Sequence, residues 1–124
     1  MRGMVFLAAG LAACASEPAL EGEARYFGVD VLRLDETLVS IVARMQAGED
    51  REDVTRYADC AISQYANEEG AGFARHLRTN ITERAGIWTA DAVYTISVEL
   101  PLGIKTIDTE TTVQSCAEAG IPTI

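Results

Sequence analysis

Several residue types that build active sites are scarce in this 124-residue chain. It has a single histidine, His76, which excludes an H-E-x-x-H zinc motif or any site made of several imidazoles. Its serines lie outside a G-x-S-x-G setting, and it has no glycine-rich phosphate loop. Its apolar runs are far shorter than the ~18 residues that cross a bilayer as a helix. These absences favour a protein without enzymatic activity, cofactor or bound metal.

Positive charge is scarce as well. Lysine and arginine together number 10 against 19 aspartates and glutamates, so the net charge is −9 at pH 7. The phosphates of nucleic acid would repel such a surface, which argues against a nucleic-acid partner. The same acidity argues against electrostatic docking on anionic lipid. The length leaves room for one domain.

What the chain does have is a leader. Arg2 supplies a positive charge, the apolar run 4–9 follows, and two small residues precede a cysteine. This is the order found in a secretory signal peptide. The sequence Leu11-Ala12-Ala13-Cys14 resembles the lipobox of bacterial lipoprotein precursors. The alternative is a cytoplasmic protein whose first residues form a short buried helix.

The resemblance implies a lipid anchor. In bacterial lipoproteins the matching cysteine, here Cys14, receives a diacylglyceryl group, the preceding residues are removed, and the new amino terminus is acylated. Residues 1–13 would then be a signal peptide and residues 14–24 a flexible tether. Several acyl chains, at ~0.8 kcal/mol per buried CH₂, would hold the protein on a membrane. Cleavage removes one arginine, which leaves nine cationic and 19 acidic side chains and a net charge of −10.

The implied location is the cell envelope, with the domain facing the periplasm. Ala15 follows the cysteine, whereas an aspartate at that position marks retention at the inner membrane in enteric lipoproteins. The resemblance therefore favours the outer membrane. A soluble periplasmic or secreted protein is the alternative.

The cysteine count agrees with export. If Cys14 carries lipid, Cys60 and Cys116 remain as an even pair, and exported domains of this size often use such a pair as a disulfide. Closing a loop of about 55 residues would stabilise the fold by roughly 4 kcal/mol by restricting the unfolded chain. The alternative is two buried free thiols. Neither cysteine has another cysteine or a histidine at ligand spacing, so a metal site is not expected.

Residues 25–124 are expected to form one α+β domain. Strands are predicted from β-branched and aromatic residues, and helices from apolar residues at spacings of three and four. The expected strands are 26–34, 37–45, 73–83, 88–99 and 104–107, and the expected helices are 51–69 and 109–119. Periodicity also allows a helix at 37–45 and a strand at 109–119. The order β-β-α-β-β-(β)-α predicts a small antiparallel sheet with helices on one face.

The ends of the two helices are marked by capping residues. Gly70 is a natural stop for the first helix, while Asp108 can cap the start of the second and Gly120 can end it. In the strand 73–83, alternation predicts two faces. Phe73, Leu77 and Ile81 are expected to point toward the core, and His76, Arg78 and Asn80 toward solvent.

Three neighbouring residues form a small basic island in this acidic chain. Arg75, His76 and Arg78 are a candidate site for a carboxylate or phosphate group of a ligand. Such an island more often pairs with the protein's own acidic residues. A hydrolytic role for His76 with Glu68, Glu69 or Asp91 is the weakest alternative.

Taken together, these features predict a small, non-enzymatic lipoprotein of the bacterial cell envelope. Its partners are expected to be the membrane, through Cys14, and another envelope component such as a protein. The alternative is an exported domain that binds an acidic ligand through Arg75, His76 and Arg78.

Overall fold

The computed structural model describes residues 24–46, 51–101, 103 and 106–124, so the leader and Cys14 lie outside the described residues. The elements are β1 (Arg25–Arg33), β2 (Leu38–Gln46), α1 (Arg51–Glu68), β3 (Phe73–Arg84), β4 (Ile87–Ser97), β5 (Thr106–Asp108) and α2 (Thr109–Glu118). This order confirms the α+β class. It also decides both open alternatives, because β2 is a strand and α2 is a helix.

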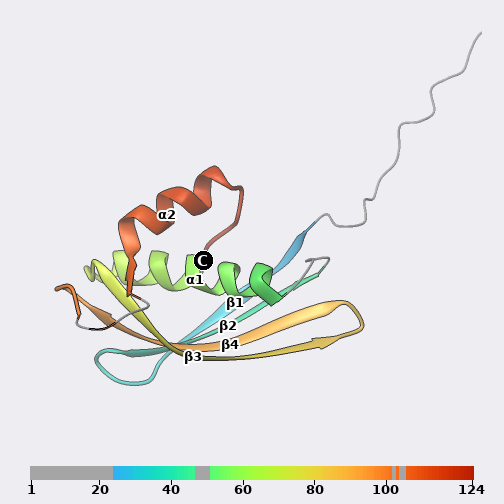
Figure 1. The fold of residues 1–124 in the computed structure, drawn as a ribbon, viewed down its shortest axis with the longest axis horizontal. Helices are drawn as coiled ribbons and strands as arrows, with labels where there is room; N and C mark the ends of the chain where they lie inside the picture. The colour runs from blue at the N-terminus through green and yellow to red at the C-terminus, as the bar shows by residue number, and fades with distance from the viewer. Residues whose placement is uncertain (1–23, 47–50, 102, 104–105) are drawn as a thin grey trace, which may run out of the picture.

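The strands form one antiparallel sheet in the order β1-β2-β4-β3-β5. Both expected hairpins are present, β1 with β2 and β3 with β4. The hairpins join through β2 and β4, which places these two strands at the centre of the sheet. Figure 1 shows the sheet curled, with both helices on the same side of it.

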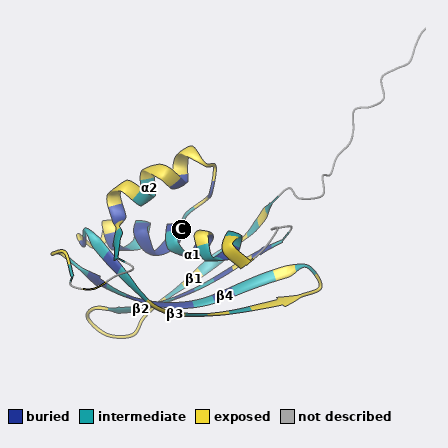
Figure 2. Ribbon diagram, in the orientation of Figure 1, coloured by how far each residue is buried: buried dark blue, intermediate teal, exposed yellow. Residues whose placement is uncertain are grey.

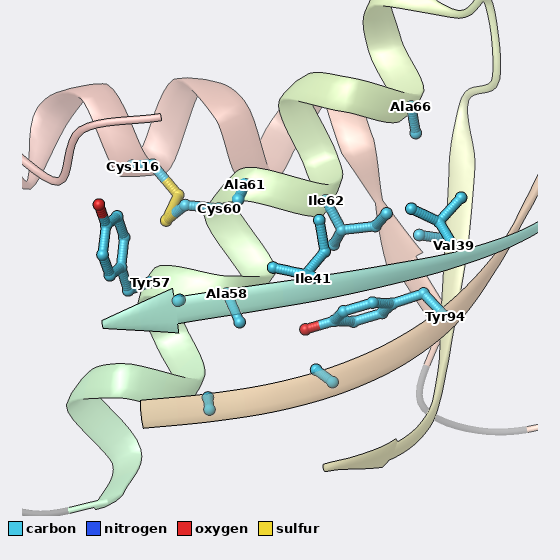
Figure 3. Close-up of a cluster of buried hydrophobic side chains, with 14 of the residues drawn as sticks. Val39, Ile41, Tyr57, Ala58, Cys60, Ala61, Ile62, Ala66, Tyr94 and Cys116 are labelled. Carbon is cyan, nitrogen blue, oxygen red and sulfur yellow. A yellow bond between two sulfur atoms is a disulfide. The ribbon is translucent and has the colours of Figure 1, made fainter. Parts of the chain in front are cut away.

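The inner face of the sheet, meaning the face toward the helices, is apolar. Alternate residues of the central strands β2 and β4 are buried there: Val39, Ile41, Ala43, Met45, Ala90, Ala92, Tyr94 and Ile96. Alanines lie on both sides of the contact, including Ala58 and Ala61 on α1 and Ala90 and Ala92 on β4. Small side chains let a helix backbone approach a sheet closely, which favours dense packing (Figure 3).

The helix α2 lies over α1 and forms a third layer (Figure 1). Only Thr109 and Cys116 are buried along its length, and Figure 2 shows most of its surface exposed. The Asp108 side chain accepts a hydrogen bond from the Thr111 amide at 3.1 Å, which confirms the expected cap. Burial of α2 therefore depends on a narrow contact with α1.

Both helices end at the expected glycines. Gly70 and Gly120 have φ angles of 84° and 74°, which lie in the left-handed region. In each case the amide of the following residue, Ala71 or Ile121, donates back to a carbonyl five residues earlier, at 2.8 and 3.0 Å. These bonds satisfy carbonyls that the helix leaves unpaired, so a glycine is favoured at both positions.

The expected facing of β3 is wrong in its first half. His76 pairs with Tyr94 and Arg78 pairs with Val93, so Leu77 has no partner and forms a β-bulge. The extra residue shifts the alternation by one position. His76 therefore points to the inner face, while Leu77 is 42% exposed and Phe73 pairs with Ser97 on the outer face. Beyond the bulge, the expected facing of Arg78, Asn80 and Ile81 agrees with the register.

A disulfide joins the two helices, as the sequence predicts. Cys60 of α1 and Cys116 of α2 are bonded, with their Cα atoms 6.0 Å apart (Figure 3). Both residues are almost fully buried. The bond links residues that are 56 positions apart in the sequence. It holds α2 against α1, although α2 itself buries few apolar side chains.

We predict that replacing both cysteines (Cys60→Ser with Cys116→Ser) lowers the free energy of unfolding by about 4 kcal/mol, because the unfolded chain regains the entropy of the open loop. Urea denaturation of the double variant and of the oxidised parent measures this difference. The parent treated with reductant serves as the control and should match the double variant. A denatured, unreduced parent in which Cys60 or Cys116 reacts with a thiol reagent contradicts the assignment.

Candidate functional site

A pocket of about 320 Å³ opens between α1, β3 and β5. Thr55 and Asp59 of α1, His76 of β3, and Thr106 and Ile107 of β5 line it. The residues come together because β5 pairs with the beginning of β3, next to the strand segment that carries His76. We call this the Asp59 pocket.

Two residues that line this pocket, Asp59 and His76, belong to a cluster of polar side chains. The Tyr94 hydroxyl, which is fully buried, donates a hydrogen bond of 2.6 Å to the Asp59 carboxylate. The His76 ring packs edge-on against the Tyr94 ring, with 5.6 Å between centroids. The His76 Nε2 atom is hydrogen-bonded to the Thr79 hydroxyl. A polar cluster thus replaces apolar packing where the bulge turns His76 inward.

Burial dominates the electrostatics of the cluster. It raises the pKa of the Asp59 carboxyl, while the hydrogen bond from Tyr94 and the nearby His76 act in the opposite direction. Burial, together with the adjacent Asp59 carboxylate, raises the pKa of the Tyr94 hydroxyl well above its usual value. Asp59 is therefore held in a setting that disfavours its charged form.

The geometry provides hydrogen-bonding groups without an assembled nucleophile. The hydrogen bond of Asp59 goes to Tyr94, and Thr79, the partner of His76, does not line the pocket. The Thr106 hydroxyl is buried and has no hydrogen-bond partner among the described residues. Within the same part of the chain, no three His, Cys, Asp or Glu side chains gather as metal ligands. The arrangement can accept and donate hydrogen bonds to a small molecule.

The predicted basic island is divided by the sheet. Arg75 pairs with Thr95 and Arg78 with Val93, which places both arginines on the outer face. His76 lies on the inner face with Tyr94. The three residues therefore do not form one patch. Neighbouring side chains of a strand point to opposite faces, so His76 and Arg75 are on different faces. The bulge at Leu77 then places Arg78 on the same face as Arg75.

The sequence did not predict that Asp59 and Tyr94 would lie near His76 or that Thr106 would line the same pocket. The acids it suggested, Glu68, Glu69 and Asp91, do not line the pocket. One signal was present in the sequence. Asp59 shares a helical face with Ile62 and Ala66, at spacings of three and four, so a carboxylate lies on an apolar stripe. Such a residue is either paired in the core or faces a cavity. Here it does both.

The fold and the bridged helix pair define a small, disulfide-containing α+β domain. The chain belongs to the family described as the YNQ4 C-terminal domain, whose family model matches residues 26–120. It is 36% identical over 87 residues to a protein of Paracoccus denitrificans named "Uncharacterized 26.9 kDa protein in nqo8 5'region". The match covers 70% of this chain and 34% of that relative, so the chain spans about a third of the relative's length. No solved structure matches the chain.

None of the helices in the described part of the chain is both long and apolar enough to span a membrane.

We predict that Asp59→Asn stabilises the protein increasingly as the pH rises. The folded state raises the pKa of Asp59, so its favourable contribution is complete below the unfolded pKa of about 4 and is lost as the pH rises through the folded pKa. An asparagine keeps an oxygen that accepts from Tyr94 and carries no charge. The difference in melting temperature, variant minus parent, should be near zero at pH 4 and grow toward pH 7.

Tyr94→Phe is the matched control for this titration. It removes the hydroxyl that stabilises the Asp59 carboxylate and should therefore steepen the loss of stability with rising pH. A difference between Asp59→Asn and the parent that is constant or shrinks with pH would show that burial does not control this carboxyl.

Proposed function

We propose that this protein is a non-enzymatic lipoprotein of the bacterial cell envelope. Cys14 carries the lipid, and the α+β domain contacts another envelope component. The observation that carries the proposal is the Cys60–Cys116 disulfide. Disulfides persist in oxidising compartments such as the periplasm and are rare in the cytosol. With these two cysteines paired, Cys14 in the lipobox-like leader is the third cysteine of the chain.

Two further observations support this proposal. The Asp59 pocket holds a hydrogen-bonded polar cluster, and its described residues do not bring an activated nucleophile to its surface. The relative with a matching segment comes from Paracoccus denitrificans, a bacterium, as a bacterial lipobox requires. A tethered domain with a stable scaffold suits a role in binding another envelope component without catalysis.

Intact mass spectrometry of the membrane-extracted protein tests the anchor. We expect a mass that lacks residues 1–13 and includes acyl groups, and we expect Cys14→Ala to abolish both changes and leave the unprocessed chain. Cys60→Ser, which leaves the leader untouched, is the control and should be processed like the parent. An unmodified full-length mass for the parent would refute the lipoprotein assignment.

A second candidate function is binding of a small ligand in the Asp59 pocket. The buried Thr106 hydroxyl, which lacks a partner among the described residues, favours it, because buried polar groups are normally hydrogen-bonded. Asp59 lines the same pocket as Thr106, and its carboxyl oxygens suit a ligand that donates hydrogen bonds, such as an amine. A thermal-shift screen with small primary amines should raise the melting temperature of the parent and not that of Asp59→Asn. No shift with the parent dismisses this candidate.

A further inference from the structure

The charges of this acidic protein are unevenly distributed between its layers. We define the open face as the side of the sheet away from α1. Five of the eight arginines among the described residues occupy outward register positions on this face: Arg25, Arg44, Arg75, Arg78 and Arg84. Three aspartates share it, Asp30, Asp91 and Asp108. The open face is therefore net positive although the whole chain is net negative.

The helices on the opposite side carry more acidic than basic residues. Within their bounds, α1 and α2 have five aspartates and glutamates besides the half-buried Asp59, and two arginines. In Figure 1 both helices lie on the same side of the sheet, so this negative charge is separated from the open face by the thickness of the core. At physiological ionic strength charges interact over about 8 Å, so a partner at the open face meets mainly the arginines.

Two of the three aspartates on the open face are already engaged. Asp30 accepts from Arg44 at 3.3 Å, and Asp108 caps α2. Arg78 and Arg84 are exposed and make no ion pair with the described residues. The arginines therefore have few partners within the described domain.

A shallow hollow on the open face adds suitable chemistry. Its volume is about 370 Å³, and it is lined by Arg44, Thr82, Arg84, Ile87 and Thr89. Guanidinium and hydroxyl groups are the donors that phosphate oxygens accept from. Leu32, on the same face, leaves 62% of its surface exposed, so the face combines positive charge with apolar side chains.

We propose that the open face lies against an anionic membrane surface, with the arginines toward phosphate-bearing lipid headgroups. The inference rests on the proposed anchor at Cys14. Ala24 follows Cys14 by ten positions, a length of chain that spans at most about 36 Å. The tether joins β1, whose first residue, Arg25, is itself on the open face. The lipid thus keeps the face within reach of headgroups and raises their effective concentration.

The strength of this contact is limited by the acidic residues nearby. Glu17, Glu21 and Glu23 of the tether oppose the attraction of the arginines. Each arginine near an anionic bilayer still contributes a favourable free energy that falls with salt. The contact therefore orients a domain that the lipid retains, and it should be sensitive to salt.

Vesicle binding by the unlipidated full chain (Cys14→Ser) tests the open face separately from the anchor. The probes are phosphatidylcholine vesicles with and without about 30% phosphatidylglycerol, at low salt and at about 0.5 M NaCl. The leader contributes equally to each variant, so only differences between variants are interpreted. We expect a preference for the anionic vesicles that high salt removes.

Two matched double variants locate the contact. Arg78→Gln with Arg84→Gln should reduce the preference about twenty-five-fold, since each arginine contributes about five-fold. Arg51→Gln with Arg56→Gln makes the same change in net charge on α1 and should leave the preference within about two-fold of the parent. Circular dichroism and thiol titration confirm that each variant is folded and oxidised.

Three outcomes would overturn the proposal. These are the absence of any preference for anionic vesicles, equal losses in the two double variants, and tighter binding to polyglutamate than to anionic vesicles. The last result would assign the face to an acidic polypeptide. The mass at Cys14 is measured independently, so a failure of the open face to bind lipid is distinguishable from a failure of the proposed anchor.

Discussion

The packing of α1 on the inner face of the sheet is the contact on which the other features depend. It includes many small residues, and Ala58 and Ala61 of the helix lie in one buried cluster with Ala90 and Ala92 of the central strand β4. Because alanine side chains are short, the helix and sheet backbones lie close together and pack densely. The same choice limits the apolar surface that each residue can bury, so a domain of this size gains from a covalent link as well.

A single turn of α1, residues 57–60, also carries the polar and covalent links that fix its surroundings. The Tyr57 hydroxyl accepts from the Gly28 amide at 2.9 Å, at the irregular position of β1. Asp59 accepts from Tyr94 of β4, and Cys60 bonds to Cys116 of α2. One helix thereby positions the edge strand, the polar cluster and the outer helix. Displacing α1 would disturb the Asp59 pocket and the disulfide together.

The separation of charge between the layers changes the meaning of the acidic composition. A net charge of −9 suggests repulsion from any anionic surface. The fold places Arg78 and Arg84 on the open face. It places the acidic residues of α1 and α2 on the other side of the sheet. Because charges farther away than the screening length contribute little, an approaching surface responds to the charges of the nearest face and not to the total charge. The acidic composition alone therefore does not exclude binding of one face to an anionic surface.

The sequence by itself determined the helix 51–69, the hairpin of the strands 73–83 and 88–99 and the helix ends at Gly70 and Gly120, because these follow from local periodicity and capping chemistry. It favoured a strand at 37–45, a helix at 109–119 and a disulfide between Cys60 and Cys116, and the structure decided each of these three over its alternative. Only the tertiary structure decided which groups meet. The bulge at Leu77 turns His76 inward, and the join of β2 to β4 sets which strand faces α1. A bulge depends on the register between strands, and register is fixed by packing across the sheet. For that reason the basic island, whose residues are neighbours in the sequence, could be recognised from the sequence. The Asp59 pocket, whose residues come from three separate elements, could not.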